Sequence, residues 1–423
     1  MIQLSPQKQI CGTFNLPGDK SISHRAALFA LFSRGTSAIE NLNTGKDVAT
    51  TLSFLRGEGI SLNKAPGPVL EITGCGLPFI NKSESFDCGN SGTTLSLLMG
   101  ILKKKCRLTG DDSLKSRNFL HQISVLRECG YQFKFEGREG HVPFEMCPST
   151  VISTMPHFKN TINSAQLKTT LLLAALNSHQ SMRFKESIST RDHTERLLKG
   201  MGAKIEKSDD EITMEAYSEL KPLKLFVPGD ISLASFFITA VLLSEGSHVI
   251  LRHVSLNPTR LAFIKLLKDM KARINIKNEN HALEPYGDIE VSSSYIEGGE
   301  VPVEMIGELI DEIPCLALLG LVARHGMHIK GAERLRNKET DRISAICYNL
   351  RNSGAHIEEY EDGFKVYPGI KLREGVVIKS FKDHRMVMAF SLLAFLLKHR
   401  FSIDEPEWVN TSYPGFFKDM FNL

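Results

Sequence analysis

The sequence predicts an α/β protein in which amphipathic helices, strands and buried helices alternate along the chain. Three observations support this fold class: a recurring helix–strand signature, a second type of helix that is apolar nearly all round, and the overall composition. Of the 423 residues, 42% are hydrophobic and 23% are charged. This profile is typical of a soluble globular protein with enough chain for two or more domains.

The first signature is a Leu followed by a basic residue, then usually a Gly and an apolar run. Each copy predicts an amphipathic helix that is closed by a Gly in the left-handed conformation and followed by a strand. Residues 190–198 are one example of such a helix. The copies recur at fairly even intervals, at Leu55-Arg56, Leu126-Arg127, Leu198-Lys199, Leu267-Lys268 and Leu350-Arg351.

The second type of helix has almost no polar face. A helix of this kind must be buried among other elements, so we expect each repeated unit to wrap sheet and helices around an internal helix. Six segments fit this description: residues 23–32, 93–102, 166–176, 233–243, 313–322 and 385–397.

Short polar turns precede these buried helices. Helix capping explains Ser, Thr, Asn and Asp at such positions without any function. It does not explain Lys20, Gln166 or Arg385. If several helix N-termini converge, their unpaired amide groups and dipoles create an anion site, to which these three side chains would add charge and hydrogen bonds.

Basic residues lie at the ends of apolar segments in every part of the chain. They are too numerous for one neutral ligand, and a substrate pair with phosphate and carboxylate groups suits them, because Arg forks match both groups. For any one residue alone, a solvated surface charge is the simpler interpretation. The set comprises Lys20, Arg25, Arg117, Arg191, Lys338, Arg342 and Arg385.

Two acidic positions, Asp311 and Glu339, are candidates for proton transfer. An acid directly before an apolar helix is more often a cap than a catalyst. A pairing of Asp311 with Lys338 and Glu339 would place cationic and acidic groups close enough to tune proton transfer.

Several classes of function find no support. The net charge is only +3 and no long basic run occurs, so we expect neither nucleic-acid nor membrane binding. The N-terminus lacks a basic segment followed by an apolar run, which favours the cytoplasm. The 8 cysteines form no CxxC pair, so we expect buried free thiols. No GxGxxG, Walker or HExxH motif appears, so no cofactor and no metal are expected.

At this point the motifs resemble a known family. Residues 16–26 (LPGDKSISHRA) are similar to the N-terminal signature of EPSP synthases, which are enolpyruvyl transferases. Residues 89–94 (GNSGTT) and 336–342 (RNKETDR) resemble the second and third signatures. Residues 163–166, 190–195, 311–312 and 383–385 are also similar to family motifs, in order and across nearly the whole chain.

The resemblance implies a fold of two similar domains. Each would consist of three βαβαββ-type units packed around buried helices, an inside-out α/β barrel, with the active site in the cleft between the domains. Residues 1–18 and 229–423 would form the first, discontinuous domain, and residues 19–228 the second. We expect a monomer.

The resemblance also implies a reaction. The enolpyruvyl group of phosphoenolpyruvate would pass to the 5-hydroxyl of shikimate-3-phosphate, with release of phosphate, by addition and elimination through a tetrahedral ketal. Asp311, helped by Lys338, would accept the hydroxyl proton, and Glu339 would protonate the methylene carbon. Lys20 would hold both substrates and is the next candidate for the base.

The remaining site residues are carried over from the family motifs as substrate ligands. Ser21 and Arg25, with Lys20, would hold shikimate-3-phosphate, and Ser164, Ala165, Gln166 and Arg191 would bind its ring and phosphate. Arg117, Arg342 and Arg385, with Asn90 and Gly92 nearby, would clamp the phosphate and carboxylate of phosphoenolpyruvate. Glyphosate occupies the phosphoenolpyruvate site in this family, and its inhibition of the enzyme depends on the residue at the position of Gly92.

The chain departs from the family pattern at a few positions. Ser96 stands where the family usually has Arg, and Leu97 and Asn118 stand where it often has Pro. The Ser96 departure puts one cationic contact near phosphoenolpyruvate in doubt. We expect Ser96→Arg to be tolerated and to change the apparent affinity for phosphoenolpyruvate more than that for shikimate-3-phosphate.

Two other functions remain as alternatives. The sister enolpyruvyl transferases that act on UDP-N-acetylglucosamine have Asn directly after the N-terminal Lys and usually a reactive Cys on a loop. Here Ser21 follows Lys20, and Cys106 and Cys129 lie in no matching motif. The second alternative is a non-catalytic binding protein of the same fold, which would need neither of the two proton-transfer acids.

Overall fold

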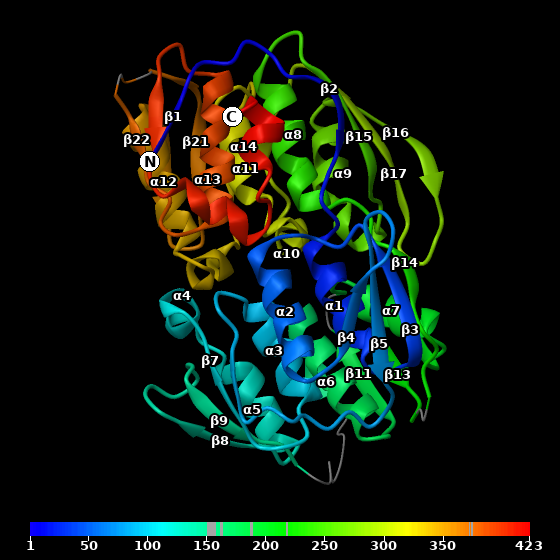
Figure 1. Cartoon of the computed structure of the whole chain (residues 1–423). Coiled ribbons are helices and arrows are strands. Elements are labelled where there is room, and N and C mark those ends of the chain that lie inside the picture. Colours follow the sequence, from blue (N-terminus) through cyan, green and yellow to red (C-terminus); the bar gives the residue numbers. More distant parts are fainter. Residues whose placement is uncertain (150–157, 161–163, 187–188, 217–218, 372, 374) are drawn as a thin grey trace. The chain divides into compact units, whose positions relative to one another are not determined.

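The computed structural model describes residues 1–149, 158–160, 164–186, 189–216, 219–371, 373 and 375–423 (Figure 1). These residues fall into two compact units. Unit 1 consists of Met1–Pro17 and Pro228–Leu423, and unit 2 of Gly18–Val227. The chain therefore leaves unit 1 after its first two strands and returns to it after unit 2 is complete.

Unit 2 contains the following elements in chain order: α1 (Lys20–Ala30), β3 (Arg34–Glu40), α2 (Lys46–Gly57), β4 (Ser61–Lys64), β5 (Val69–Cys75), β6 (Ser85–Asp87), α3 (Gly92–Ile101), β7 (Cys106–Thr109), α4 (Asp112–Ser116), α5 (Leu120–Glu128), β8 (Gln132–Phe135), β9 (Phe144–Cys147), β10 (Phe158–Asn160), α6 (Ala165–Asn177), β11 (Met182–Glu186), α7 (His193–Gly200), β12 (Ile205–Ser208), β13 (Glu211–Met214) and β14 (Lys224–Phe226).

Unit 1 begins with β1 (Ile2–Leu4) and β2 (Cys11–Asn15) and continues with α8 (Ile231–Leu243), β15 (His248–Ser255), the 3-10 helix η1 (Pro258–Arg260), α9 (Ala262–Asp269), β16 (Arg273–Asn280), β17 (Tyr286–Ser292), β18 (Gly299–Glu300), η2 (Val303–Met305), α10 (Ile306–Leu309), α11 (Ile313–Leu319), β19 (Met327–Ile329) and η3 (Glu333–Asn337). It ends with α12 (Arg342–Ser353), β20 (Ala355–Tyr360), β21 (Gly363–Ile370), β22 (Val377–Ile378), α13 (His384–Ser391), η4 (Leu392–Phe395), β23 (Phe401–Ile403), η5 (Pro406–Thr411) and α14 (Phe416–Phe421).

One sheet pattern recurs in both units. In the sheet β6-β7-β9-β8, β6 and β7 are parallel neighbours on either side of α3 in the chain, and β8 and β9 add antiparallel pairs after α5. This is the βαβαββ arrangement. The sheets β10-β11-β13-β12, β14-β3-β5-β4, β16-β17-β15-β2 and β18-β19-β21-β20 have the same strand order, and β1-β23-β22 is a shorter version. The predicted fold class is confirmed.

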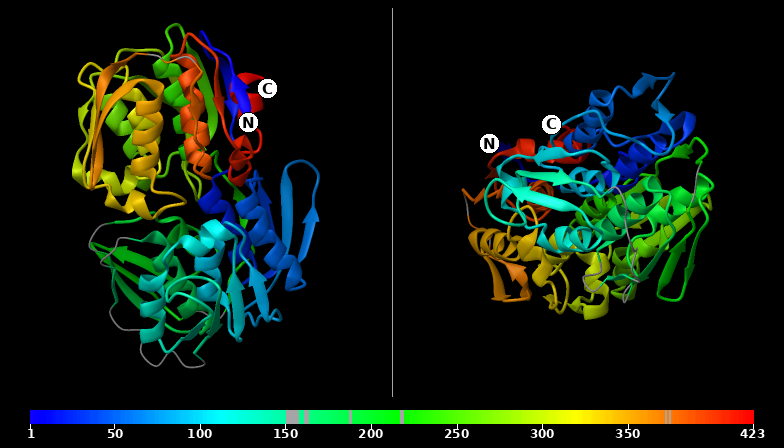
Figure 2. Two further views of the ribbon diagram at one scale, coloured as in Figure 1. Left: turned by 90° about the vertical axis from the view of Figure 1, so that its left-hand side faces the viewer. Right: turned by 90° about the horizontal axis from the view of Figure 1, so that it is seen from below.

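The six helices predicted to be buried are the internal helices of these units. They are α1, α3, α6, α8, α11 and α13, and every residue of α8, α11 and α13 is buried. Within each unit they lie between the sheets (Figure 2). The bounds differ at some ends. Helix α1 already begins at Lys20, because Asp19 Oδ1 accepts a hydrogen bond from the Ile22 amide at 2.9 Å. Helix α13 ends at Ser391 and continues as η4.

The Leu-basic signatures lie in α2, α5, α7, α9 and α12, each followed by a strand as predicted. Helix α7 begins at His193, later than the predicted start at residue 190. Four of these helices are followed by a Gly with positive φ, namely Gly59, Gly130, Gly202 and Gly354. In the fourth copy, Lys271 takes the same place with φ +73°.

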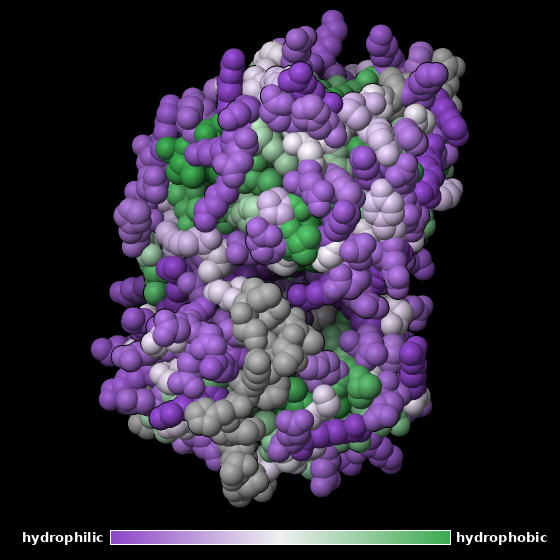
Figure 3. Space-filling view, turned by 180° about the vertical axis from the view of Figure 1, so that it is seen from behind, coloured by the Kyte–Doolittle hydropathy of each residue, from purple (hydrophilic) through white to green (hydrophobic). Residues whose placement is uncertain are grey.

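Hydrophilic residues cover most of the face seen in Figure 3, with smaller hydrophobic areas between them. Among the helices of the described residues, none is long and apolar enough to cross a membrane. All eight cysteines are free thiols. The prediction that they are buried is wrong for Cys11, Cys75 and Cys147, which lie on strands or strand ends at the surface.

Candidate active site

In unit 1, Asp311 is surrounded by cations. Its Oδ1 lies 3.8 Å from Lys338 Nζ, 3.5 Å from Arg342 Nη1 and 3.7 Å from Arg385 Nε. These cations come from the end of η3, the start of α12 and the start of α13. Asp311 is not a helix cap, since the N-cap of α11 is Glu312. The predicted approach of Asp311 and Lys338 is therefore present. We call the group of Asp311, Lys338, Glu339, Arg342 and Arg385 the acid cluster.

Arg342 is the centre of the acid cluster and is almost completely buried. Its Nε donates to Asp383 Oδ2 at 2.7 Å, and its Nη2 donates to Glu339 Oε2 at 2.7 Å. Burial alone would lower the pKa of Arg342, but the carboxylates of Asp383, Glu339 and Asp311 outweigh it and raise that pKa above its usual value. Arg342 therefore carries a fixed positive charge.

Asp383 is a functional position that sequence reasoning did not include among the site residues. Its Oδ1 accepts a hydrogen bond from the Arg385 amide at 2.8 Å, so it caps α13, and its other oxygen orients Arg342. Arg385 in turn donates from Nη1 to the Asp311 carbonyl at 2.9 Å. The motif at residues 383–385 was the available signal, but a capping role alone also explains an Asp there.

A buried ion pair lies directly beside Asp311. Arg260 Nη2 is 3.2 Å from Glu312 Oε1, and the Ser232 hydroxyl donates to the same carboxylate oxygen. Both charged side chains are almost fully buried. The pair holds the turn that carries Asp311 against α8. Sequence reasoning missed Arg260 and Ser232, because neither lies in a recognised motif.

In unit 2, Lys20 is the first residue of α1, and its Nζ lies 3.0 Å from Asp47 Oδ2 in the first turn of α2. The next residue, Ser21, accepts a long hydrogen bond of 3.5 Å from Arg191 Nη1. Arg191 lies just before α7. Lys20, Ser21 and Arg191 therefore belong to neighbouring helix N-termini within unit 2.

Arg25 is buried and contacts three helices rather than an open surface. Its Nε donates to Thr194 Oγ1, its Nη1 to the Ser21 carbonyl and its Nη2 to Thr169 Oγ1, each at 2.9 Å. These bonds join α1, α6 and α7. Arg25 therefore ties the N-terminal parts of these helices together in the core of unit 2.

The residues at the start of α6 are partly used in capping. Ser164 is the N-cap and accepts a hydrogen bond from the Leu167 amide at 3.3 Å, and Ala165 is the first helical residue. Gln166 donates from Nε2 to Thr93 Oγ1 at 3.1 Å and so joins α6 to α3. Asn163, the first residue of this motif, lies outside the described residues.

Asn90, Gly92 and Arg117 lie together. Arg117 Nη2 donates to Asn90 Oδ1 at 2.6 Å, and Asn90 Nδ2 donates to Asp111 Oδ2 at 3.0 Å. A Cβ placed on Gly92 would lie 3.1 Å from Arg117 Nη1, closer than most real Cβ contacts. The absence of a side chain at Gly92 therefore lets Arg117 approach the N-terminus of α3.

Ser96 does not lie at a surface that a ligand could reach. It is fully buried, its Oγ donates to Gln122 Oε1 at 3.1 Å, and its carbonyl accepts from Thr170 Oγ1 at 2.7 Å. An Arg here would place a guanidinium among α3, α5 and α6 without a carboxylate partner, which costs several kcal/mol in buried positions, on the order of 3–5. The structure thus argues against the expectation that Ser96→Arg is tolerated.

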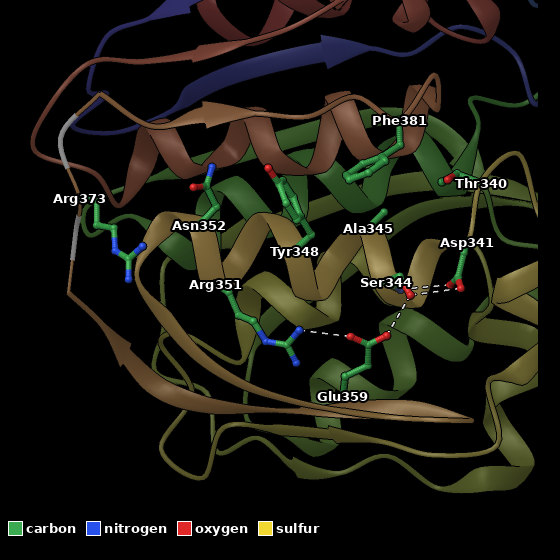
Figure 4. Close-up of a pocket in the computed structure, with 10 residues that line it drawn as sticks. All are labelled: Thr340, Asp341, Ser344, Ala345, Tyr348, Arg351, Asn352, Glu359, Arg373 and Phe381. Atoms are coloured by element: carbon green, nitrogen blue, oxygen red, sulfur yellow. Dashed lines mark hydrogen bonds and ion pairs between the residues drawn. The ribbon is translucent and has the colours of Figure 1, made fainter.

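A separate pocket of about 620 Å³ runs along one face of α12 (Figure 4). Glu359 lies at its side, bonded to Ser344 and Arg351. The pocket does not contain Asp311, Lys338 or Glu339 and is therefore distinct from the acid cluster. Its lining residues are Thr340, Asp341, Ser344, Ala345, Tyr348, Arg351, Asn352, Glu359, Arg373 and Phe381.

For metal ions, no group of three or more His, Cys, Asp or Glu side chains in the described part of the chain is arranged to hold one.

Comparison with known proteins gives consistent matches over the whole length. The family model for EPSP synthase (3-phosphoshikimate 1-carboxyvinyltransferase) matches residues 4–420. A 3-phosphoshikimate 1-carboxyvinyltransferase from Petrotoga mobilis is 38% identical over 98% of this chain and 97% of its own length. The structure of EPSP synthase from Acinetobacter baumannii superposes with a TM-score of 0.84 at 31% identity, covering 99% of this chain and 96% of that chain.

A more distant structure, the enolpyruvyl transferase NikO from Streptomyces tendae, covers 100% of this chain and 96% of its own at a TM-score of 0.77. Its sequence identity is only 14%, so this likeness concerns the fold alone.

Proposed function

The chain belongs to the EPSP synthase family, and on that premise we propose that it transfers the enolpyruvyl group of phosphoenolpyruvate to the 5-hydroxyl of shikimate-3-phosphate and releases phosphate. The observation that supports this most is the acid cluster. Three cations from separate segments, Lys338, Arg342 and Arg385, each lie within 3.8 Å of the Asp311 carboxylate. Such a cluster suits anionic substrates and proton transfer without a metal or cofactor.

Asp311 is the proposed base. It accepts the proton of the 5-hydroxyl, while Lys338 and Arg385 beside it stabilise the charge that develops on the reacting groups. The hydroxyl oxygen then bonds to the central carbon of phosphoenolpyruvate. The ion pair of Arg260 with Glu312, next in the chain, keeps the turn of Asp311 in place.

Glu339 is the proposed acid that protonates the methylene carbon during the addition. In the present arrangement Glu339 accepts a hydrogen bond from Arg342 Nη2, while Arg342 Nε donates to Asp383. An anionic group of phosphoenolpyruvate that draws Arg342 toward itself would leave the Glu339 carboxyl able to carry a proton. In the elimination, the new methyl group gives one proton back to the Glu339 carboxylate, the carbon–carbon double bond forms again, and the bond from the central carbon to the phosphate oxygen breaks, so that phosphate leaves.

The residues of unit 2 are proposed as substrate ligands. Lys20, Ser21 and Arg191 would hold shikimate-3-phosphate with the N-terminus of α6 at Ser164, Ala165 and Gln166, and Arg117 with Asn90 would hold phosphoenolpyruvate. Helix N-termini suit anions, because their amide groups and dipoles favour negative charge.

A phosphate-release assay tests the proposal. The purified protein receives phosphoenolpyruvate together with shikimate-3-phosphate, with UDP-N-acetylglucosamine, or with no acceptor. Release that depends on shikimate-3-phosphate supports the proposed function. Release only with the nucleotide sugar would identify the sister activity, and release with neither, despite calorimetric binding of shikimate-3-phosphate, would indicate a non-catalytic binding protein.

We further propose that the enzyme acts as a monomer in the cytoplasm. Light scattering coupled to size-exclusion chromatography would give the mass of one chain, 47.2 kDa, and a mass of two chains would contradict this proposal.

A further inference from the structure

A buried ion cluster in unit 2 has no place in the proposed reaction. Lys168 lies in the apolar helix α6 and is fully buried, with Nζ 3.2 Å from Glu186 Oε1 and 2.6 Å from Glu195 Oε1. Lys207 approaches Glu186 Oε2 at 3.5 Å from a partly exposed position. We name Lys168, Glu186 and Glu195 the buried triad.

The buried triad is costly. Its two carboxylates face one buried ammonium group, and burial raises the pKa of Glu195, although Lys168 counteracts that shift. Removing such charges from water costs several kcal/mol per ion, and apolar residues of similar size are often at least as stable. A contribution to stability is therefore a poor explanation for a fully buried Lys near the start of the apolar helix α6.

The triad contacts both sides of Arg191. On one side, Glu186 Oε1 accepts a hydrogen bond from Thr190 Oγ1 at 2.6 Å, and Glu186 Oε2 lies 3.5 Å from the Thr190 amide nitrogen. On the other side, Glu195 belongs to the first turn of α7 and binds Lys168. In the sequence, Arg191 thus lies between Glu186 and Glu195, which both form ion pairs with the buried Lys168.

A second buried cation holds the same turn. Arg25 Nε donates to Thr194 Oγ1 at 2.9 Å, and Thr194 also shares a hydrogen bond of 2.7 Å with Thr169 on α6. The segment from Thr190 to Glu195 is therefore attached to the core at three of its residues. The side chain of Arg191 between these attachments reaches Ser21 at the start of α1.

We infer that the buried triad and Thr190 position Arg191 so that its guanidinium meets the phosphate of shikimate-3-phosphate. These are positioning residues, since none of them need touch the substrate. The inference rests on the proposed function. A rigid ammonium–carboxylate frame restricts the directions in which Arg191 can point, and such a frame lowers the entropy lost when the phosphate binds.

Thr190 offers the mildest test, because its bond to Glu186 can be removed while the triad stays intact. Thr190→Val keeps the shape of the side chain and removes the hydroxyl, whereas Thr190→Ser keeps the hydroxyl. We expect Thr190→Val to raise the KM for shikimate-3-phosphate by roughly five- to tenfold, less than the full effect of one hydrogen bond to a charged group, because the bond acts on the substrate only through Arg191. The kcat and the KM for phosphoenolpyruvate should stay at wild-type values, and Thr190→Ser should restore the wild-type KM.

A double-mutant cycle tests whether the effect passes through Arg191. Arg191→Ala should raise the KM for shikimate-3-phosphate, and adding Thr190→Val to it should have no further effect. Lys185→Met is the matched control. Lys185 lies next to Glu186 on β11, and its substitution removes an exposed ion pair with Asp210. This variant should leave both KM values unchanged.

The outcomes separate the inference from the proposed function. A wild-type protein that neither binds nor turns over shikimate-3-phosphate refutes both. If the wild type is active but Thr190→Val changes only the thermal midpoint, or lowers kcat and both affinities together, the positioning role is wrong and the function stands. Equal effects of Thr190→Val in the presence and absence of Arg191 would also overturn it.

Discussion

Among single residues, Asp311 has the environment that best suits a base for the hydroxyl proton. Asparagine has nearly the same shape but cannot take up a proton. We expect Asp311→Asn to reduce turnover by about 10²- to 10⁴-fold, with a moderate loss of affinity for shikimate-3-phosphate, because the same carboxylate would bind the hydroxyl. Steady-state kinetics and calorimetry measure both effects. A near-wild-type rate would place the base elsewhere, with Lys20 as the next candidate.

Glu339 should show a different balance between rate and binding. Its proposed proton transfer occurs only in the transition state, so Glu339→Gln should lower kcat by about 10²-fold or more while shikimate-3-phosphate binds almost as in the wild type. The Gln carbonyl can still accept the hydrogen bond from Arg342, which keeps the acid cluster in place. Equal losses in kcat and in calorimetric affinity would contradict the role of Glu339.

Gly92 is the residue at which we expect one added methyl group to change the inhibition by glyphosate. An added Cβ would lie 3.1 Å from Arg117 Nη1, so an Ala would displace this cation or push into the space beside it. Glyphosate is longer than phosphoenolpyruvate. We therefore expect Gly92→Ala to raise the inhibition constant for glyphosate by roughly tenfold or more, and the KM for phosphoenolpyruvate by a smaller factor.

Steady-state inhibition of the wild type and of Gly92→Ala decides this prediction. The segments at residues 163–166 and 190–195 resemble those of family members that are often tolerant. If both proteins ignore glyphosate equally, tolerance has another origin and the proposed contact at Gly92 is wrong.

Among the elements, the helices that carry the Leu-basic signature all end in the same way. Behind α2, α5, α7 and α12 a Gly takes the left-handed conformation, but behind α9 the residue is Lys271 with φ +73°. The hydrogen bonds are alike, since Lys271 N donates to the Lys268 carbonyl at 2.9 Å and Ala272 N to the Leu267 carbonyl at 2.9 Å. The fourth copy therefore keeps the geometry at the cost of strain.

This comparison predicts that Lys271→Gly stabilises the protein. A left-handed L-residue costs about 1–2 kcal/mol, and part of the gain is offset by the greater freedom of Gly in the unfolded chain, which leaves about 0.5–1 kcal/mol. Lys271 is exposed, so no packing is lost. Gly202→Ala, at the matching position behind α7, should have the opposite effect. Denaturant unfolding measures both, and a destabilised Lys271→Gly would show that the Lys side chain has contacts that outweigh the strain.

For the whole molecule, the two compact units predict two folding domains. Among the described residues, the sheets of unit 2 pair only strands of unit 2, and its last strand, β14, lies parallel to β3 near its beginning. The last residue of the unit is attached to β3 as well, since Val227 N donates to the Glu40 carbonyl at 2.9 Å. Residues 18–227 alone should therefore fold with a cooperative thermal transition.

The matched control for this prediction is the fragment 18–219, which lacks β14 and leaves an edge of β3 unpaired. It should unfold at a clearly lower temperature in calorimetry and circular dichroism. Neither fragment should release phosphate from phosphoenolpyruvate, because Asp311 and Glu339 belong to unit 1. A fragment 18–227 without a cooperative transition would mean that unit 2 is not a folding domain.

Features that depend on neighbouring residues could be predicted from the sequence. The six buried helices follow from their lack of a polar face, and the Gly behind four outer helices follows from the conformation that a helix end requires. The motifs around Lys20, Gly92 and Glu339 are specific enough to indicate the family by themselves. Helix starts were less accurate, because caps such as Asp19 extend a helix into the polar turn before it.

Features that depend on contacts between distant segments were decided only by the tertiary structure. The sequence alone could not show that Lys338, Arg342 and Arg385 meet at Asp311, or that Asp383 orients Arg342. It also could not reveal that Lys168 is buried between two carboxylates, or that Ser96 points into the core. The amino-acid type fixes the charge and shape of a side chain. Its partners and its burial are set by the packing of helices that lie far apart in sequence.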